Sequence, residues 1–434
     1  MRILFLSHYF PPEVNAPASR TFEHCREWVR SGHQVSVVTC APNHPRGVVY
    51  SGYRNRLWQR ETLDGIEVIR LGTYITANEG FARRSLGYLS FLIACVCAAP
   101  FLPRADVLVT TSPQFFNGLA GYPVKLIKGV PWVLEIRDLW PESVLAVGAV
   151  RNRLLIRLLS GLERFAYRKC DHIVPVTEAF RRYIVAKGIA PQKVSVVRNG
   201  VDRALFSGDA DPRELRSSLQ LEGKFIVSYV GTHGMAHGLE TVLNAAAQLR
   251  SHPHIAFLLV GDGAERQRLL ELRKQLGLTN VTMLEQQPKE RMPQIWALSD
   301  ASLVLLRKLP LFETVIPSKI FESMAMSRPI ILGVGGEARE IVEEGQAGLV
   351  IEPESSASLC AAVLKLANNP ELGRQLGANG QRYVAAHFDR RVLARRFEGV
   401  LTALRDQAEQ PERPALRNRP AEVRESGVRD ERHG

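Results

Sequence analysis

Cysteine is scarce in this chain, and its spacing excludes the frameworks usually built on it. Six cysteines are spread over 434 residues, and no two form a Cys-x-x-Cys pair. Most lie in apolar segments, which is typical of reduced core thiols and not of a disulfide framework. The first residues, Met1 to Leu6, read as a strand leading to Pro11-Pro12, and not as a signal peptide. These features predict a cytoplasmic protein.

Other missing patterns exclude whole classes of protein. No Gly-x-Gly-x-x-Gly fingerprint follows the first predicted strand, which argues against NAD binding. No repeat of fixed period is present, which argues against a solenoid. Aromatic residues make up only 7% of the chain and no nucleic-acid-binding module is recognised, so we expect no nucleic-acid partner.

The longest uncharged stretch runs from Ser85 to Pro103. It has 19 residues, close to the ~20 that a membrane-spanning helix needs. A span here would put the strands before and after it on opposite sides of a bilayer. Two interpretations stay open: a buried helix, or a helix that lies partly in the membrane surface.

Positive charge is concentrated in the first half of the chain. Residues 1–200 carry 26 Lys and Arg against 14 Asp and Glu, whereas residues 201–404 carry 23 of each. Residues 151–169 alone hold six basic residues and one Glu, interleaved with Leu, Ile and Phe at helical spacing. Either this is a solvated basic face on a core helix, or this half faces something anionic, such as phospholipid or a lipid diphosphate.

Strand and helix patterns alternate along the chain, which predicts an α/β fold with mostly parallel sheets. The length predicts two domains. We expect two doubly wound, Rossmann-like domains facing a cleft, residues 1–200 and 201–388, followed by a closing helix at 389–404 and a disordered tail at 405–434. The predicted strands are 3–9, 34–39, 66–71, 106–110, 132–136, 172–176 and 193–197 in the first domain, and 225–231, 255–260, 281–284, 302–305, 330–332 and 349–351 in the second.

A nucleotide diphosphate site is predicted in the second domain. Glycine turns follow two of its strands, at 231–234 and 261–263, where open α/β sheets bind ligands. In the segment 317–325, Ser318 stands ready to cap a helix that carries Lys319 and Glu322. A glycine-rich turn at 333–336 leads into another helix. Backbone amides and a lysine can bind the negative charge of a diphosphate, and a carboxylate can accept hydrogen bonds from sugar hydroxyls.

These segments, with four others, resemble the retaining family-4 glycosyltransferases of GT-B fold. The likeness is strongest to the branch that builds bacterial capsule, colanic-acid and O-antigen sugars, including L-fucosamine transferases, and it covers the chain up to about residue 404. The four segments are Ser-His-Tyr-Phe-Pro-Pro-Glu at 7–13, Gly-His-Gln-Val at 32–35, Glu-Ile-Arg-Asp-Leu-Trp-Pro-Glu-Ser at 135–143 and Asn-Gly-Val-Asp at 199–202.

The resemblance implies roles for the second-domain residues. The loop of Gly231, Thr232, His233 and Gly234 lies near the donor pyrophosphate, Gly261 and Gly263 near the base, Glu322 on the ribose hydroxyls, and Lys319 on the phosphates beside Ser318. No metal is implied. The chain departs from many relatives in lacking Arg and Lys in the first of these loops. It also has Thr314, and Glu313 one place earlier, where relatives carry the first of two glutamates. Which of these two takes over that role stays open.

On the acceptor side, Arg137 and Asp138 fall where relatives often have His-Asp. The carboxylate of Asp138 could orient or deprotonate an acceptor hydroxyl, and Arg137 could hold a phosphate. Both residues could instead be structural, pairing with each other or elsewhere. His8, at the end of the first strand, is either a third catalytic candidate or a hydrogen-bonded turn residue.

The predicted function is a peripheral membrane glycosyltransferase on the cytoplasmic face. It would move a UDP-linked hexosamine or deoxyhexosamine, with retention, to a polyprenyl-diphosphate-linked saccharide in surface polysaccharide biosynthesis. Two alternatives stay open, a nucleotide-sugar epimerase of the same architecture and a non-catalytic membrane adaptor. The epimerase leaves the basic first half unexplained, and the adaptor does not need Lys319 and Glu322 beside glycine turns.

Overall fold

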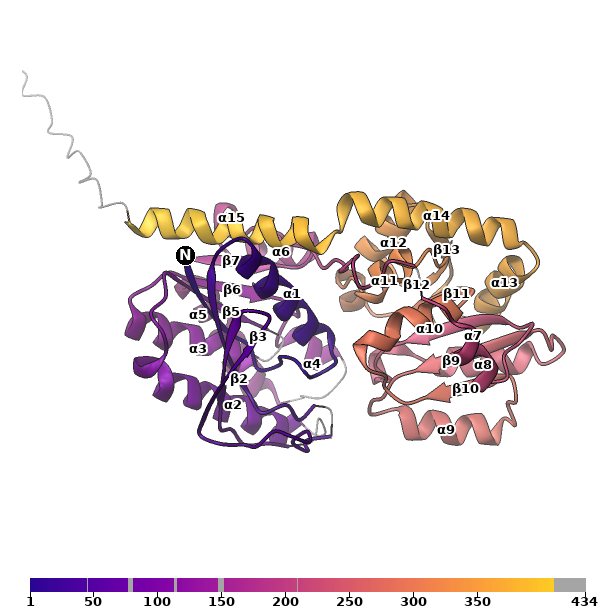
Figure 1. Ribbon diagram of the computed structural model, residues 1–434, viewed down its shortest axis with the longest axis horizontal. Helices are drawn as coiled ribbons and strands as arrows, with labels where there is room; N and C mark the ends of the chain where they lie inside the picture. The colour runs from indigo at the N-terminus through magenta and orange to yellow at the C-terminus, as the bar shows by residue number, and fades with distance from the viewer. Residues whose placement is uncertain (45, 77–80, 113–114, 147–151, 209, 410–434) are drawn as a thin grey trace, which may run out of the picture.

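The computed structural model describes residues 1–44, 46–76, 81–112, 115–146, 152–208 and 210–409. Two α/β domains lie side by side, each built on its own sheet (Figure 1). The predicted fold class, two Rossmann-like domains, is therefore confirmed. The tail predicted to be disordered lies, from residue 410 onward, outside the described residues.

The first domain has a seven-stranded sheet in the order β3-β4-β2-β1-β5-β6-β7. All neighbouring strands are parallel except the edge pair β3 and β4. The inner strands are buried along almost their whole length, as expected for a sheet covered on both faces. In sequence order the strands are β1 (Arg2–Leu6), β2 (Gln34–Cys40), β3 (Trp58–Leu63), β4 (Ile66–Leu71), β5 (Val107–Thr111), β6 (Trp132–Ile136) and β7 (His172–Pro175).

The second domain has a six-stranded parallel sheet in the order β10-β9-β8-β11-β12-β13. The strand order reverses between β8 and β11, because β9 continues on one side of β8 and β11 lies on the other. Doubly wound sheets bind ligands beyond the carboxyl ends of the strands at such a point. The strands are β8 (Phe225–Val230), β9 (Ile255–Val260), β10 (Val281–Leu284), β11 (Ala301–Leu305), β12 (Ile330–Gly333) and β13 (Gly348–Val350).

Helices cover both sheets. Those of the first domain are α1 (Ala16–Arg30), α2 (Phe81–Ala98), α3 (Phe115–Lys128), α4 (Glu142–Ala146), α5 (Arg153–Lys169) and α6 (Glu178–Ala186). Those that follow are α7 (Arg213–Ser218), α8 (Glu240–Gln248), α9 (Arg266–Gln275), α10 (Met292–Leu298), α11 (Lys319–Ala325), α12 (Gly336–Glu344), α13 (Ser356–Ala367), α14 (Pro370–His387) and α15 (Arg390–Glu409). None of the described helices is long and apolar enough to cross a bilayer.

The strands predicted from the sequence differ from those of the structure at two places. Strand β3 was not predicted, because an antiparallel edge strand buries little and its residues show no apolar run. Residues 193–197 form no strand. They follow a short 3-10 turn and bond loosely to β7, with the Ser195 amide 3.0 Å from the Ile173 carbonyl. The segment 202–222, at the start of the second domain, contains the short helix α7.

The last helix returns to the first domain. α15 lies along α1 (Figure 1), where the Trp28 indole donates to the carbonyl of Ala394 over 3.0 Å. The chain thus crosses between the domains twice, and the two crossings are bonded to each other. The Val201 amide donates to the carbonyl of Phe388, and the Arg390 amide donates to that of Val201, both over 3.0 Å. We refer to this hydrogen-bonded pair, where the two connections between the domains meet, as the pivot.

Candidate active site

Two glycine turns meet beyond β8 and β9. The amide of Gly231 donates to the carbonyl of Val260 over 2.9 Å, and the amide of His233 donates to that of Asp262 over 2.9 Å. Gly261 has a φ of 149° and lies so close to the first turn that a Cβ there would be 1.9 Å from the Gly231 carbonyl oxygen. Only glycine fits this position. The two predicted turns therefore form one continuous floor at the carboxyl edge of the sheet.

Lys319, on the first turn of α11, lies directly over this floor. Its Nζ is 3.5 Å from the centroid of the Tyr229 ring and 3.0 Å from where a Cβ on Gly231 would lie. The Nζ is buried and has no hydrogen-bond partner among the described residues. Burial lowers the pKa of Lys319 to about 7, an effect that Glu322 partly opposes. The ring face gives the ammonium group partial compensation, and its donors stay unused.

His233 is the second group of the floor with unused polar atoms. It is fully buried, and neither ring nitrogen has a hydrogen-bond partner among the described residues. Burial, with Arg266 and Lys319 nearby, lowers the pKa of His233 to about 4, so the ring is neutral near pH 7. The neighbouring Thr232 carbonyl accepts a hydrogen bond from the Tyr229 hydroxyl over 2.8 Å, which fixes the turn to the strand.

Glu322 lies three residues after Lys319 but does not pair with it. Its Oε2 accepts a hydrogen bond from the Trp296 indole over 3.2 Å, and the described residues hold no ion pair between Glu322 and Lys319. Burial raises the pKa of Glu322, against the opposing effects of Lys289 and of the indole. Lys319 and Glu322 therefore do not neutralise each other through an ion pair, and both side chains stay available to a ligand.

The other predicted donor residues make contacts within the second domain. Ser318 precedes α11, but its side chain makes no cap hydrogen bond, contrary to the prediction, because its own backbone is already helical. The Thr314 hydroxyl donates to the Leu311 carbonyl over 2.6 Å. Glu313 is exposed, and its carbonyl lies against Gly336, where a Cβ would be 1.8 Å away. Gly263 also approaches this floor closely, since a Cβ on it would lie 2.6 Å from the His233 carbonyl oxygen.

The glycine-rich turn at 333–336 is followed directly by a contact across the domain boundary. Glu337, which follows it on α12, accepts a hydrogen bond from the Ala179 amide over 2.6 Å and one from Arg198 over 3.2 Å. Ala179 belongs to the first turn of α6 in the first domain. Glu337 therefore caps a helix of the other domain with its carboxylate.

The acceptor-side candidates lie at the carboxyl edge of the first sheet. Arg137 directly follows β6, and its guanidinium donates to the carbonyls of Ala16 and Pro17 over 2.9 and 3.1 Å. It therefore anchors the start of α1, although its Nε is buried without a partner among the described residues. Asp138 follows it and is half-buried.

His8, which follows β1, is buried between aromatic rings of α2. The ring centroids of Tyr88 and Phe91 lie 5.1 and 5.2 Å from its own. Burial lowers the pKa of His8 to about 3, and its Nδ1 has no partner among the described residues. A neutral imidazole in this environment could accept a proton only at low pH.

Sequence reasoning missed two residues that shape the site. Tyr229 and Trp296 are both fully buried, and each lies in an apolar stretch of the sequence, so the pattern indicates ordinary core residues. Tyr229 supports Lys319 with its ring, and Trp296 supports Glu322 with its indole nitrogen. No periodicity in the sequence distinguishes a core aromatic residue that also faces a ligand site.

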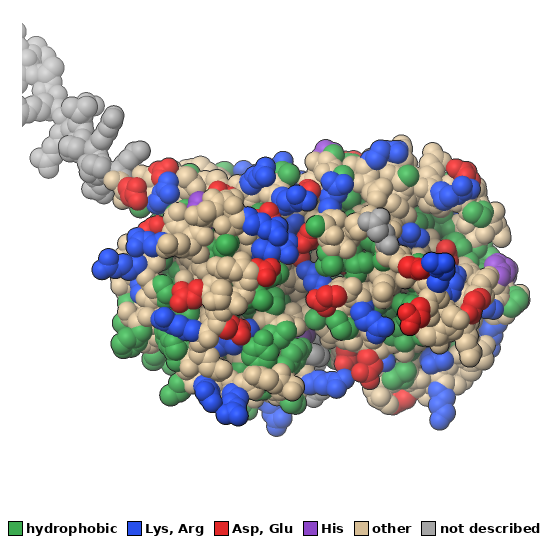
Figure 2. Space-filling model, in the orientation of Figure 1, with side chains coloured by type: hydrophobic (Ala, Val, Ile, Leu, Met, Phe, Trp, Pro, Cys, Tyr) green, Lys and Arg blue, Asp and Glu red, His purple; other side chains and the backbone are tan. Residues whose placement is uncertain are grey.

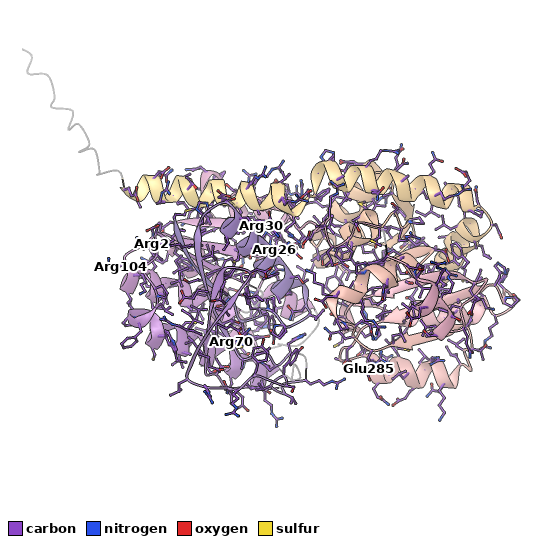
Figure 3. The ribbon with its side chains drawn as sticks, viewed as in Figure 1. Arg2, Arg26, Arg30, Arg70, Arg104 and Glu285 are labelled. Carbon is purple, nitrogen blue, oxygen red and sulfur yellow. The ribbon has the colours of Figure 1, made fainter. Side chains whose placement is uncertain are left out.

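The site faces the first domain across a boundary with several polar contacts. Gln286 donates to the carbonyl of Val14 over 2.6 Å, and Arg46 lies 3.5 Å from Glu285 and 3.8 Å from Asp262. Figure 3 shows Glu285 on the side of the second domain that faces the first. The two carboxyl edges, with the donor candidates on one and the acceptor candidates on the other, therefore oppose each other.

Comparison with known proteins decides which family this architecture represents. Residues 15–200 match the profile described as glycosyl transferase 4-like domain, and residues 211–383 match that of glycosyl transferases group 1. The chain is a member of these glycosyltransferase families. A putative colanic acid biosynthesis glycosyl transferase, WcaI of Escherichia coli K12, is 27% identical over 387 residues, which cover 84% of this chain and 91% of the relative.

Solved structures agree with this glycosyltransferase fold. Sucrose-phosphate synthase from Thermosynechococcus elongatus superposes with a TM-score of 0.73 at 19% identity, covering 94% of this chain and 99% of that chain. The Anabaena protein Alr3699/HepE, in complex with UDP-glucose, superposes with a TM-score of 0.70 at 19% identity, covering 93% of this chain and 100% of the other. At these identities the likeness concerns the fold. The family membership does not favour the epimerase or the non-catalytic adaptor.

Proposed function

We propose that this glycosyltransferase takes a sugar from a UDP-linked donor whose diphosphate lies over the floor formed by the two glycine turns. The observation that carries the proposal is the buried Nζ of Lys319, which has no hydrogen-bond partner among the described residues. A buried ammonium group without an acceptor is costly, and a bound anion supplies the missing charge and acceptors. The Anabaena relative of the same fold was solved with UDP-glucose, which supports a donor of this class.

Each site residue then has a role in the transfer. The bond between the sugar C1 and the diphosphate breaks, and its electron pair leaves with the diphosphate, where Lys319 meets the growing negative charge. The acceptor hydroxyl oxygen forms the new bond to C1 on the same face, so the configuration is retained, and its proton passes to the departing diphosphate. Neutral His233 can donate one hydrogen bond to a phosphate oxygen, and Glu322 accepts from ribose hydroxyls. We propose that no resident metal takes part, since these groups supply the needed charge.

The acceptor is proposed to be a saccharide on a polyprenyl diphosphate. Such an acceptor is held in a membrane, so the enzyme must reach an anionic lipid surface. The layer of helices α2, α3 and α5 on the first domain has the required chemistry. Neither α2 nor α3 contains an acidic residue, and the one acidic residue of α5, Glu163, is buried and paired with Lys187.

Large apolar side chains are exposed on the same helices and on the 3-10 turn after α2. Their exposed fractions range from 38% at Leu89 and Phe165 to 75% at Leu154. Hydrophobic and basic side chains also gather along the left and lower margins of the first domain in Figure 2. Exposed apolar residues on helices that carry no exposed acidic side chain favour an anionic membrane over another protein. The exposed apolar residues are Leu86, Leu89 and Ile93 of α2, Phe101 of the 3-10 turn, Leu126 and Ile127 of α3, and Leu154, Leu158 and Phe165 of α5.

The exposed face of α5 carries basic and apolar residues on every turn. A hollow of about 530 Å³ lies along it, lined by Gly161, Arg164, Phe165, Arg168 and Lys169. Three cations around one hollow suit a phosphate headgroup, while Leu154 and Leu158 on the preceding turns can enter the apolar layer. We propose that α5 is the main membrane contact and that the enzyme acts on the cytoplasmic face.

The decisive experiment is direct. The full-length protein is incubated with a panel of nucleotide sugars and a polyprenyl-diphosphate-linked saccharide, and products are identified by mass spectrometry. A product heavier than the acceptor by one sugar residue, with the anomeric configuration of the donor by NMR, supports the proposal. Absence of transfer from every UDP-sugar, together with absence of UDP binding by calorimetry, contradicts it.

A further inference from the structure

Glu23, on α1 of the first domain, contacts the second domain and the pivot at the same time. It is 4% exposed. Its Oε1 accepts a hydrogen bond from the Lys289 ammonium group of the second domain. Its Oε2 accepts from Nε of Arg390 over 2.5 Å, and the same arginine donates to the carbonyl of Gly200. One carboxylate therefore bridges the two domains beside the crossings of the chain.

The two cations of Glu23 differ in their distance along the chain from the pivot. Arg390 is part of the pivot, because its amide bonds to Val201. Lys289 belongs to the short 3-10 turn Lys289–Arg291, which lies at the domain boundary and far along the chain from both crossings. If the second domain rotates about the pivot, Arg390 can keep its contact, while Lys289 is carried away from α1. Of the two ion pairs of Glu23, the pair with Lys289 is therefore the one that opening must break.

The turn that carries Lys289 continues directly into α10. Trp296 follows Lys289 by seven residues, which is about two helical turns, so the two side chains lie on the same side of this segment. Trp296 donates to Glu322, and Lys289 donates to Glu23. A single rigid segment thus joins the carboxylate of the donor site to the first domain. The influence of Lys289 on the pKa of Glu322 is consistent with this proximity.

We infer that Lys289 is a positioning residue that couples donor binding to closure of the two domains through α10. The inference rests on the proposed function, in which Glu322 binds donor hydroxyls. A donor that holds Glu322 and Trp296 in place holds Lys289 against Glu23, and the same ion pair preorganises the donor site. Coupling of this kind is reciprocal. Loss of the Glu23–Lys289 ion pair therefore weakens donor binding, and loss of the donor weakens the ion pair.

The test compares Lys289→Met, Lys289→Arg and Trp296→Phe in the full-length protein, with UDP as the probe. Lys308→Met is the matched control, since Lys308 forms an exposed ion pair with Glu352 within the second domain. Small-angle scattering reports domain closure, and calorimetry reports UDP affinity. We expect ligand-free Lys289→Met to have a larger radius of gyration than the wild type and a UDP dissociation constant raised about fivefold or more.

The other variants locate the effect. Lys289→Arg should restore both the compact shape and the affinity, because the cation is kept. Trp296→Phe should keep the compact ligand-free shape but bind UDP more weakly, because it breaks only the contact with Glu322. Wild-type scattering and affinity in Lys289→Met, or wild-type UDP binding in Trp296→Phe, overturns the inference. If the wild type itself binds no UDP, the proposed function fails. The ligand-free shape of Lys289→Met then still decides whether the Glu23–Lys289 ion pair holds the two domains together.

Discussion

The Nζ of Lys319 lies 3.5 Å above the centre of the Tyr229 ring, with no hydrogen-bond acceptor among the described residues. The ring belongs to β8 and the lysine to α11, 90 positions later, so the contact is made by the sheet order and not by local sequence. It holds a cation over the glycine floor while leaving its donors free for a ligand.

Lys319→Ala should reduce kcat on the order of 100-fold, by analogy with loss of one donor at an oxyanion site, and should change KM less. The reason is that negative charge builds on the diphosphate as the glycosidic bond breaks, so the ammonium group binds the transition state more strongly. Lys319→Arg should rescue the rate only in part, because the larger guanidinium does not fit over the ring in the same way. Steady-state kinetics with the donor identified in the nucleotide-sugar panel measure kcat and KM. A near-normal kcat in Lys319→Ala would contradict this role and make His233 the main phosphate contact.

Glu322→Ala should weaken donor binding by roughly 1.5–3 kcal/mol, the usual cost of losing hydrogen bonds to a charged group. The melting temperature should change little, because the side chain is half-buried and, among the described residues, its hydrogen-bond partner is the Trp296 indole. Calorimetric titration with the donor gives the affinity, with Glu352→Ala as an exposed control in the same domain. Unchanged donor affinity in Glu322→Ala would remove this residue from the site.

Donor affinity should fall as the pH rises through about 7. The pKa of Lys319 in the free protein is lowered to about 7, so the ammonium form that attracts the diphosphate is lost above this pH. A bound anion raises that pKa, so binding near pH 8 should take up a proton, seen as a heat that depends on the buffer. A UDP-sugar is the proper probe, because its diphosphate diester keeps its charge over this range. His233, with a pKa of about 4, should not contribute above pH 5. An affinity that is flat from pH 6 to 9 contradicts the assignment.

Arg164→Glu combined with Arg168→Glu should release the full-length protein from anionic vesicles. Each basic residue near an anionic surface contributes about 1 kcal/mol, and two charge reversals also add repulsion. Leu154→Ser with Leu158→Ser should weaken binding even at low salt, because it removes exposed apolar area. Co-sedimentation with vesicles containing phosphatidylglycerol measures both effects. Arg395→Glu with Arg396→Glu on α15 is the control, and equal loss of binding there would show a general charge effect and not a face on α5.

Gly261→Ala should disrupt the donor site through the backbone. The new Cβ would lie 1.9 Å from the Gly231 carbonyl oxygen, at a φ of 149°. The two turns must therefore separate, and we expect lost donor binding with a lower melting temperature. Gly399→Ala on α15 is a suitable control, since nothing lies within 4 Å of its Cβ position. Wild-type donor binding by Gly261→Ala would show that the floor formed by the two turns is not required.

Much of the architecture follows from local pattern. Buried parallel strands read as short apolar runs, so strands such as Ile66–Leu71 and Val281–Leu284 were predicted with their observed bounds. The edge strand β3 was not predicted, because few of its side chains are buried. Residues 193–197 were wrongly predicted as a strand, because their apolar residues pack beside β7 without forming a ladder. Helix α2 packs one face against the domain and exposes the other, since Phe91 is buried while Ile93 is 52% exposed, and its contact with a membrane surface stays a prediction.

The sequence by itself determined the two α/β domains, the glycine turns and the position of Lys319 and Glu322 in the first turn of a helix. These depend on the periodicity and spacing of residues close together in the chain. Only the tertiary structure decided which groups face them: Tyr229 under Lys319, Trp296 beside Glu322, and Glu23 between Lys289 and Arg390. Periodicity tells which side of an element is apolar, but the partner across that side depends on strand order and crossover path. Those are set by packing of the whole domain, and so the chemistry of each charged group was fixed by residues 26 to 367 positions away.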